Sequence, residues 1–88
     1  MRFYGVGSPG HAALALSLPG AARVRITVHD VSGRRVAVLA EGALPSGTHR
    51  FALRRDGAWL PSGVYYGRAE VTLAGERKFL TAKVVLAR

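Results

Sequence analysis

Hydrophobic and polar residues alternate along two early segments of the chain. In residues 14–18 every second residue is leucine, and in residues 23–29 valine and isoleucine alternate with arginine, threonine and histidine. Successive side chains of a β-strand point to opposite faces, so this alternation is typical of a strand that is buried on one face only. We therefore predict a half-buried antiparallel strand in each segment.

Four later segments continue the pattern, and they cover residues 35–40, 48–54, 64–73 and 77–88. The residues expected to point inward from the last three are Phe51 and Leu53, then Tyr65, Gly67, Ala69, Val71 and Leu73, then Leu80, Ala82, Val84 and Leu86. This places the ring of Tyr65 in the core and that of Tyr66 in solvent. The adjacent apolar residues Val38 and Leu39 predict a β-bulge in the segment 35–40.

Turn-forming residues separate the predicted strands. Glycine accepts the positive φ of a tight turn, and an aspartate carboxylate accepts hydrogen bonds from the turn backbone. The predicted turns and loops contain Asp30-Val31-Ser32-Gly33, Glu41-Gly42, Pro45-Ser46-Gly47, Asp56-Gly57 and Pro61-Ser62-Gly63. The residues expected to define turns are Asp30, Gly33, Gly47 and Gly63, and we expect Asp30 to accept backbone N–H bonds.

The fold class follows from this arrangement. No segment shows an apolar stripe at helical spacing, and turn signals recur between short alternating segments. About six or seven such strands predict an all-β fold, a small antiparallel Ig-like or fibronectin-like β-sandwich. The 88 residues are expected to form one domain, with residues 1–10 as a linker or first edge segment. Residues 12–18 behind Arg2 mimic a signal peptide only loosely, because the apolar run is short.

The composition of the chain excludes several kinds of functional site. The chain has no cysteine, which excludes disulfides, thiolate metal sites and cysteine catalysis. It has no apolar run of the roughly 18 residues that a membrane-spanning helix needs. Lysine and arginine total 13 against 5 acidic residues, for a net charge of +8. A basic excess of this size is compatible with binding to an anionic partner. It is equally compatible with a genome composition that favours arginine at solvent-facing positions.

Basic residues of several predicted strands could form one surface. The residues that would form it are Arg23, Arg25, Arg50, Arg54 and Arg68. Tyr66 lies on the same face as Arg68, as in a platform on which nucleic-acid bases stack. Binding of nucleic acid or of an anionic cell surface is therefore kept as an alternative function, although the chain lacks the usual RNA-binding motifs.

Catalytic and metal-binding patterns are weak. The three histidines are not spaced like a helix-borne zinc motif, and the five acids are scattered over different segments. No nucleophile elbow or phosphate-binding loop occurs. We interpret His49 as a packing and hydrogen-bonding residue. We predict that the domain is not an enzyme, and we assign no catalytic residue, metal or cofactor.

Several motifs together resemble a known family. They are Leu16-Ser17-Leu18-Pro19, the D-x-x-G-R-x-V sequence from Asp30 to Val36, Gly47-Thr48-His49, the S-G-x-Y sequence from Ser62 to Tyr65, and the ending Lys83-Val84-Val85-Leu86. In this order they resemble the C-terminal Ig-like domains related to the Ig domain of the flagellar hook-capping protein. The type IX (Por) secretion C-terminal sorting domain is a close relative, and the resemblance covers about residues 7–88.

The resemblance implies an interaction or sorting module at the C-terminus of an exported bacterial protein, on the cell surface or outside the cell. Its partner would be the secretion machinery, upstream domains of the same polypeptide or a cell-surface component. The positions implied for sorting are Ser62, Gly63, Tyr65, Lys83, Val84 and Leu86. The last strand, with its exposed edge, is the expected handle. A purely structural spacer domain is the remaining alternative.

Overall fold

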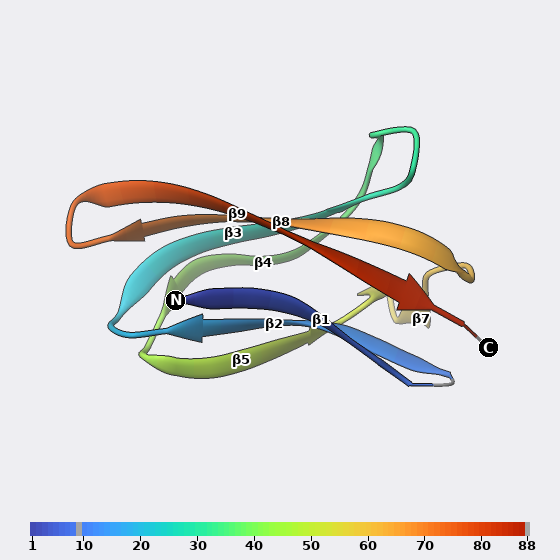
Figure 1. Cartoon of the computed structure of the whole chain (residues 1–88), viewed down its shortest axis with the longest axis horizontal. Helices are drawn as coiled ribbons and strands as arrows, with labels where there is room; N and C mark the ends of the chain where they lie inside the picture. Colours follow the sequence, from blue (N-terminus) through green and yellow to red (C-terminus); the bar gives the residue numbers. More distant parts are fainter. Residues whose placement is uncertain (9, 88) are drawn as a thin grey trace.

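Two antiparallel sheets pack face to face in the computed structural model, which describes residues 1–8 and 10–87 (Figure 1). The described residues form no helix. The strands are β1 (Arg2–Ser8), β2 (His11–Leu18), β3 (Ala22–His29), β4 (Arg35–Leu44), β5 (Gly47–Ala52), β6 (Arg54–Arg55), β7 (Ala58–Trp59), β8 (Gly63–Leu73) and β9 (Glu76–Leu86). The prediction of a small antiparallel β-sandwich is confirmed.

The strand order brings distant parts of the chain together. The three-stranded sheet has the order β1-β2-β5, and the four-stranded sheet has the order β4-β3-β8-β9. The short strands β6 and β7 form a separate hairpin. In Figure 1 the four-stranded sheet lies above the three-stranded one, and β9 passes across β8 and then runs down toward the C-terminus. Among the described residues, no helix has the length and apolarity needed to span a membrane.

The core lies between the sheets and is built from the inward positions of the alternating strands. The largest fully buried side chains are Leu14, Leu16, Ile26, Leu53, Leu86, Val28 and Val71. The ring of Tyr65 is also buried, with 6% of the residue exposed, whereas Tyr66 is 43% exposed. Both tyrosines therefore lie as the alternation predicts. A Cβ at Gly67 would lie 2.5 and 2.8 Å from the two methyl carbons of Leu14 and 3.0 Å from Cζ of Phe3, so a larger residue there would require these side chains to move.

Two edge strands from different sheets pass unusually close to each other. A Cβ at Gly5 of β1 would overlap the carbonyl oxygen of Lys83 and would lie 2.9 Å from Cβ of Val84. The amide of Gly10 donates a hydrogen bond of 2.8 Å to the carbonyl of Ala87. Residues 1–10 thus contribute an edge strand, Arg2–Ser8, that covers the C-terminal half of β9.

The boundaries of the middle strands differ from the sequence prediction. The loop expected at Glu41-Gly42 is wrong, because β4 continues to Leu44 and Glu41 pairs with Arg25. Gly42 has a φ of 128° and continues the strand through a conformation that few other residues adopt. The predicted bulge is confirmed, since Ile26 pairs with Ala40 and Thr27 with Val38, which leaves Leu39 as the extra residue.

The later strands also change in length. The strand predicted for residues 48–54 ends at Ala52, after which the chain leaves the three-stranded sheet. Leu53 is fully buried and its amide donates to the carbonyl of Ala12, so its predicted inward position is confirmed. The last strand ends at Leu86, and Arg88, which the prediction included, lies outside the described residues.

Candidate recognition surface

The outer face of the four-stranded sheet gathers charged and aromatic side chains from four strands. We define the outer face by the cross-strand neighbours that point away from the three-stranded sheet. In the order β4, β3, β8 and β9, its rows are Arg35, His29, Tyr66 and Lys83; Val38, Thr27, Arg68 and Thr81; Glu41, Arg25, Glu70 and Phe79; and Ala43, Arg23, Thr72 and Arg77. Val85 follows Lys83 on the same face of β9, two residues along the strand.

Large apolar side chains are exposed on this face. The exposed fractions are 45% for Val38, 43% for Tyr66, 53% for Phe79 and 49% for Val85. Among the described residues, the only other large exposed apolar side chains are Met1 and Val31. The apolar exposure is thus concentrated on one face of one sheet, where it can contribute to binding.

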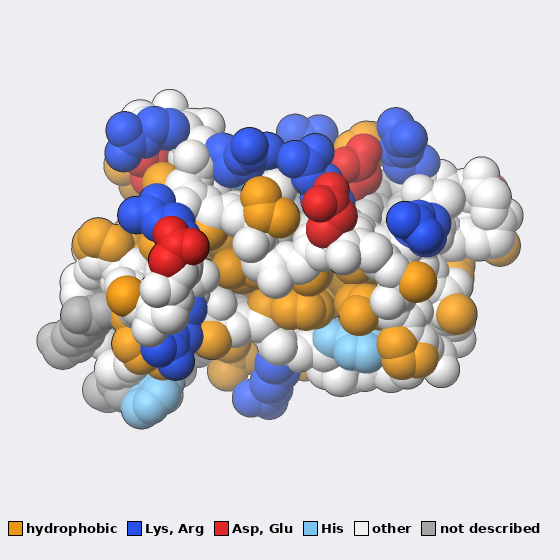
Figure 2. All heavy atoms as spheres, turned by 180° about the vertical axis from the view of Figure 1, so that it is seen from behind, with side chains coloured by type: hydrophobic (Ala, Val, Ile, Leu, Met, Phe, Trp, Pro, Cys, Tyr) orange, Lys and Arg blue, Asp and Glu red, His pale blue; other side chains and the backbone are white. Residues whose placement is uncertain are grey.

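The same face carries an excess of positive charge. The guanidinium of Arg25 lies 3.5 Å from the Glu41 carboxylate, and that of Arg77 lies 3.7 Å from the Glu70 carboxylate. Within the described part of the chain, no acidic group lies within ion-pair distance of Arg23, Arg35, Arg68 or Lys83. Figure 2 shows basic side chains gathered along the side of the four-stranded sheet, with acidic side chains set among them.

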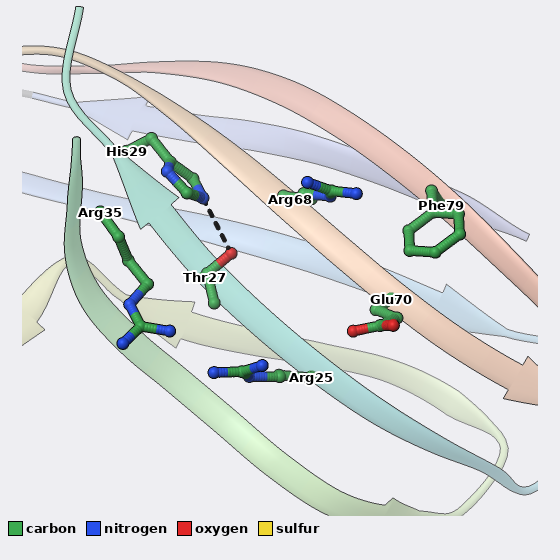
Figure 3. Close-up of a pocket in the computed structure, with 7 residues that line it drawn as sticks. All are labelled: Arg25, Thr27, His29, Arg35, Arg68, Glu70 and Phe79. Atoms are coloured by element: carbon green, nitrogen blue, oxygen red, sulfur yellow. Dashed lines mark hydrogen bonds between the residues drawn. The ribbon is translucent and has the colours of Figure 1, made fainter. Parts of the chain in front are cut away.

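A hollow of about 220 Å³ opens in the middle of the outer face. Its lining consists of Arg25, Thr27, His29, Arg35, Arg68, Glu70 and Phe79 (Figure 3). The Arg68 guanidinium lies 5.0 Å from the centroid of the Phe79 ring, within the range of a cation–π contact. Three arginines from three different strands therefore surround one hollow with an aromatic wall.

His29 is oriented by two hydrogen bonds at the end of this hollow. Its Nδ1 lies 3.4 Å from the carbonyl oxygen of Gly33, and its Nε2 lies 3.1 Å from Oγ1 of Thr27. A carbonyl can only accept, so the neutral ring carries its proton on Nδ1, and the Thr27 hydroxyl donates to Nε2. Both ring nitrogens are engaged, which leaves His29 as a positioned wall of the hollow.

The residues that the resemblance implies for sorting do not form a single surface. Tyr65, Val84 and Leu86 are buried in the core, where Val84 is 3% and Leu86 1% exposed. Ser62 is exposed in the turn before β8, and Gly63 begins that strand opposite Leu86. Of the six, only Lys83 belongs to the outer face.

The five arginines of the predicted basic surface also lie on more than one surface. Arg23, Arg25 and Arg68 do lie on the outer face. Arg50 belongs to β5, which pairs with β2, so it lies on the outside of the other sheet. Arg54 lies on the β6–β7 hairpin, where it donates to the Gly57 carbonyl and its guanidinium is 5.4 Å from the Trp59 ring centroid. Grouping these two arginines with the others is therefore wrong.

Sequence reasoning missed Arg35, Val38, Phe79 and Val85 as members of this surface. Alternation along β9 contained a usable signal, because Phe79 and Val85 are out of phase with the inward residues Leu80, Ala82, Val84 and Leu86. Arg35 could not be placed without the strand pairing, because a second register shift, between Val28 and His29, decides which face it joins.

The turn residues behave largely as the sequence predicts. Oδ1 of Asp30 accepts hydrogen bonds from the amides of Ser32 and Arg34 at 3.0 and 3.1 Å. Gly33 and Gly47 have φ values of 89° and 119°. Gly63 does not have a positive φ, so its backbone conformation does not require glycine.

The other histidines are also engaged in local contacts. Nε2 of His49 donates to the carbonyl of Pro45 at 2.8 Å, which agrees with the hydrogen-bonding interpretation. The His11 ring meets the Trp59 ring edge-on, with centroids 5.6 Å apart. In the described part of the chain, no three histidine or acidic side chains come together in a way that could hold a metal ion.

Comparison of the sequence with models of protein families finds no match, and comparison with curated proteins finds none either.

Proposed function

We propose that this chain is a non-catalytic recognition module of an exported bacterial protein, and that its partner binds the outer face of the four-stranded sheet. The observation that carries the proposal is the concentration of Val38, Tyr66, Phe79 and Val85 beside basic side chains on that one face. Exposed aromatic residues and arginines are the side chains most enriched at protein–protein contacts.

The partner proposed first is a protein of the secretion machinery. The resemblance to sorting domains supports this choice, because the last strand bears the motif Lys83-Val84-Val85-Leu86. Lys83 and Val85 point outward and are the members of this motif that a partner could touch, whereas Val84 and Leu86 are buried. A partner strand has less access to the edge of β9 than the sequence suggested, because β1 covers its C-terminal half. We therefore assign recognition to the side chains of the face.

The test is an export assay with matched variants. The chain would be fused to the C-terminus of a folded reporter and produced in a bacterium that has a type IX secretion system. We expect the reporter to reach the cell surface or the medium, and K83E or V85S to lower the exported amount roughly tenfold. The control R50E changes an exposed arginine of the opposite sheet and should leave export unchanged.

Each contrary outcome has a definite meaning. Retention of the unaltered fusion inside the cell contradicts the sorting role. Export that K83E and V85S leave intact contradicts the assignment of the outer face. Truncation is a poor substitute for these variants, because loss of residues 83–88 also removes Val84 and Leu86 from the core. A truncated chain would fail by unfolding, whatever its recognition role.

A second candidate is binding to an anionic partner, which the notable charge of the outer face favours. Four of its basic side chains lie beyond ion-pair distance of any acid in the part of the chain that the structure describes. Desolvating such charges is favourable only against an anion that hydrogen-bonds to them.

A further inference from the structure

We infer that the hollow among Arg25, Arg35 and Arg68 is a binding site for a phosphate group carried on a larger ligand. The inference rests on the proposed role of the outer face as a recognition surface and specifies the chemistry that one part of it recognises. Three features support it: the placement of three arginines around the hollow, the charge balance of the hollow, and its aromatic wall.

The three guanidinium groups approach the hollow from different strands. Arg35 comes from β4, Arg25 from β3 and Arg68 from β8. Figure 3 shows them on different sides of Thr27, at the centre of the hollow. A guanidinium presents up to five N–H donors in a rigid plane. A carboxylate offers two oxygens in one plane, whereas a tetrahedral phosphate directs its oxygens to several sides and can bond to donors from three strands at once.

The charge balance of the hollow favours an anion. Its lining includes three arginines and one acid, Glu70, and that acid is paired with Arg77 outside the hollow. Arg25 has an ion-pair partner in Glu41, but no described acid lies within ion-pair distance of Arg35 or Arg68. The positive groups repel one another when the hollow holds only water. A phosphate with one or two negative charges relieves this repulsion and forms charge-assisted hydrogen bonds.

The aromatic wall indicates what carries the phosphate. Phe79 is 53% exposed, and it also holds the guanidinium of Arg68 by its cation–π contact. A planar base or the apolar face of a sugar can pack on such a ring beside the phosphate. The ligand class is therefore a phosphate ester with an adjoining ring, such as a nucleotide unit or a phosphorylated sugar. A lipid phosphate would use the same donors without the ring contact.

Titration of the isotope-labelled full chain, followed by amide NMR signals at low ionic strength, tests the inference. The probes are inorganic phosphate, a sugar phosphate, a short oligothymidylate, vesicles containing phosphatidylglycerol, and succinate as a dicarboxylate control. We expect saturable shifts of the Thr27 and Arg68 signals with the phosphate probes, and weaker binding of succinate. R35A and R68A should each weaken phosphate binding roughly tenfold. R50A, which removes the same charge from the opposite sheet, should change it less than about twofold.

The probes and controls separate the possible outcomes. Tightest binding of the oligothymidylate or of the sugar phosphate supports the site and its ligand class. Tightest binding of the vesicles supports the phosphate site but overturns the role assigned to the Phe79 ring. Shifts that do not saturate, equal losses in R50A and R68A, or succinate binding as tight as phosphate would overturn it. Arg35, Arg50 and Arg68 are all exposed, so thermal unfolding should show that the variants are no less stable than the unaltered chain.

Failure of the phosphate site can be distinguished from failure of the proposed function. If no phosphate probe binds but K83E still blocks export, the outer face remains a protein-recognition surface and the phosphate site is wrong. If phosphate binds at the hollow and export is independent of the outer face, the phosphate site stands and the assignment of export recognition to the outer face is wrong.

Discussion

Asp30 holds the turn between β3 and β4 through one carboxylate oxygen. Oδ1 accepts the hydroxyl of Ser32 at 2.6 Å as well as two backbone amides, and Oδ2 lies 3.5 Å from Nε of Arg34. The hydrogen bond from the Ser32 side chain is the main reason that the pKa of Asp30 lies below its ordinary value. The backbone hydrogen bonds and the charge of Arg34 act in the same direction, and desolvation opposes them. This turn also supplies the Gly33 carbonyl that orients His29.

The lowered pKa of Asp30 predicts a specific pH dependence of stability. Because the folded chain prefers the charged carboxylate, Asp30 stabilises the fold above the ordinary aspartate pKa of about 3.9, and this contribution disappears as the pH falls through the lower folded value. The free energy of unfolding, measured by urea titration between about pH 6 and pH 2.5, should therefore fall less steeply with acid in D30N than in the unaltered chain. S32A should lie between the two. An identical acid dependence in all three proteins contradicts the prediction.

Tyr65 and Tyr66 provide a matched test of burial at neighbouring positions. The phenol of Tyr65 donates to the carbonyl of Pro61 from a buried ring, whereas Tyr66 is exposed on the outer face. Y65F removes the donor and should lower the free energy of unfolding by about 1 kcal/mol. Y66F should change it by less than about 0.5 kcal/mol. Denaturant unfolding of both variants measures the difference, and a larger loss in Y66F would contradict the assignment of faces.

At the scale of the strands, alternation is sufficient to predict the inward residues where one face of the strand is buried and the other is exposed to solvent. It identified the inward residues of β2, β3, β8 and β9, because burial of leucine and valine imposes a period of two on the sequence. It failed at β4, an edge strand with two register shifts, where half-buried residues and glycine resemble a loop. The Arg2–Ser8 strand was also ambiguous, because its glycines Gly5 and Gly7 remove the alternating signal.

The candidate site was less predictable than the strands. Which arginines share a surface depends on which strands are neighbours, and alternation within a single strand carries no such information. Arg50 shows the effect, since its strand alternates as predicted but pairs into the three-stranded sheet. The hollow itself requires β4, β3, β8 and β9 to lie side by side, with the register between them fixed by their pairing. The strand faces can be predicted from the sequence, but their assembly into a surface cannot.

The close approach of β1 and β9 depends on a glycine that alternation could not explain. A Cβ at Gly5 would overlap the Lys83 backbone, whereas a Cβ at Gly7 would lie 3.3 Å from the carbonyl oxygen of Val85. Because backbone atoms cannot move aside as a flexible side chain can, G5A should lower the free energy of unfolding by about 1–3 kcal/mol. G7A, with its milder contact, should cost less. Denaturant unfolding compares the two variants, and equal stability of G5A and the unaltered chain would show that β1 does not pack on β9 this closely.

At the scale of the whole molecule, repulsion among positive charges is the dominant electrostatic effect. The chain has a net charge of +8, and the ion pairs within its described residues are those of Arg25, Arg34 and Arg77, each with an exposed arginine side chain. Exposed pairs each contribute roughly 0–1 kcal/mol, so screening them costs little. Compacting the chain brings the excess positive charges closer together, which opposes folding at low ionic strength.

Salt should therefore stabilise this fold. Raising sodium chloride from about 10 mM to 150 mM shortens the screening length from roughly 30 Å to 8 Å, and the free energy of unfolding should increase on the order of 1 kcal/mol as repulsion is screened. Sodium phosphate at the same ionic strength should stabilise further, because an anion that binds only the folded chain adds to screening by mass action. In the double variant R35A/R68A the stabilisation by chloride should be smaller, and the additional stabilisation by phosphate should be absent. Thermal unfolding in matched buffers measures both, and a chain that becomes less stable with chloride would show that its ion pairs outweigh its repulsions.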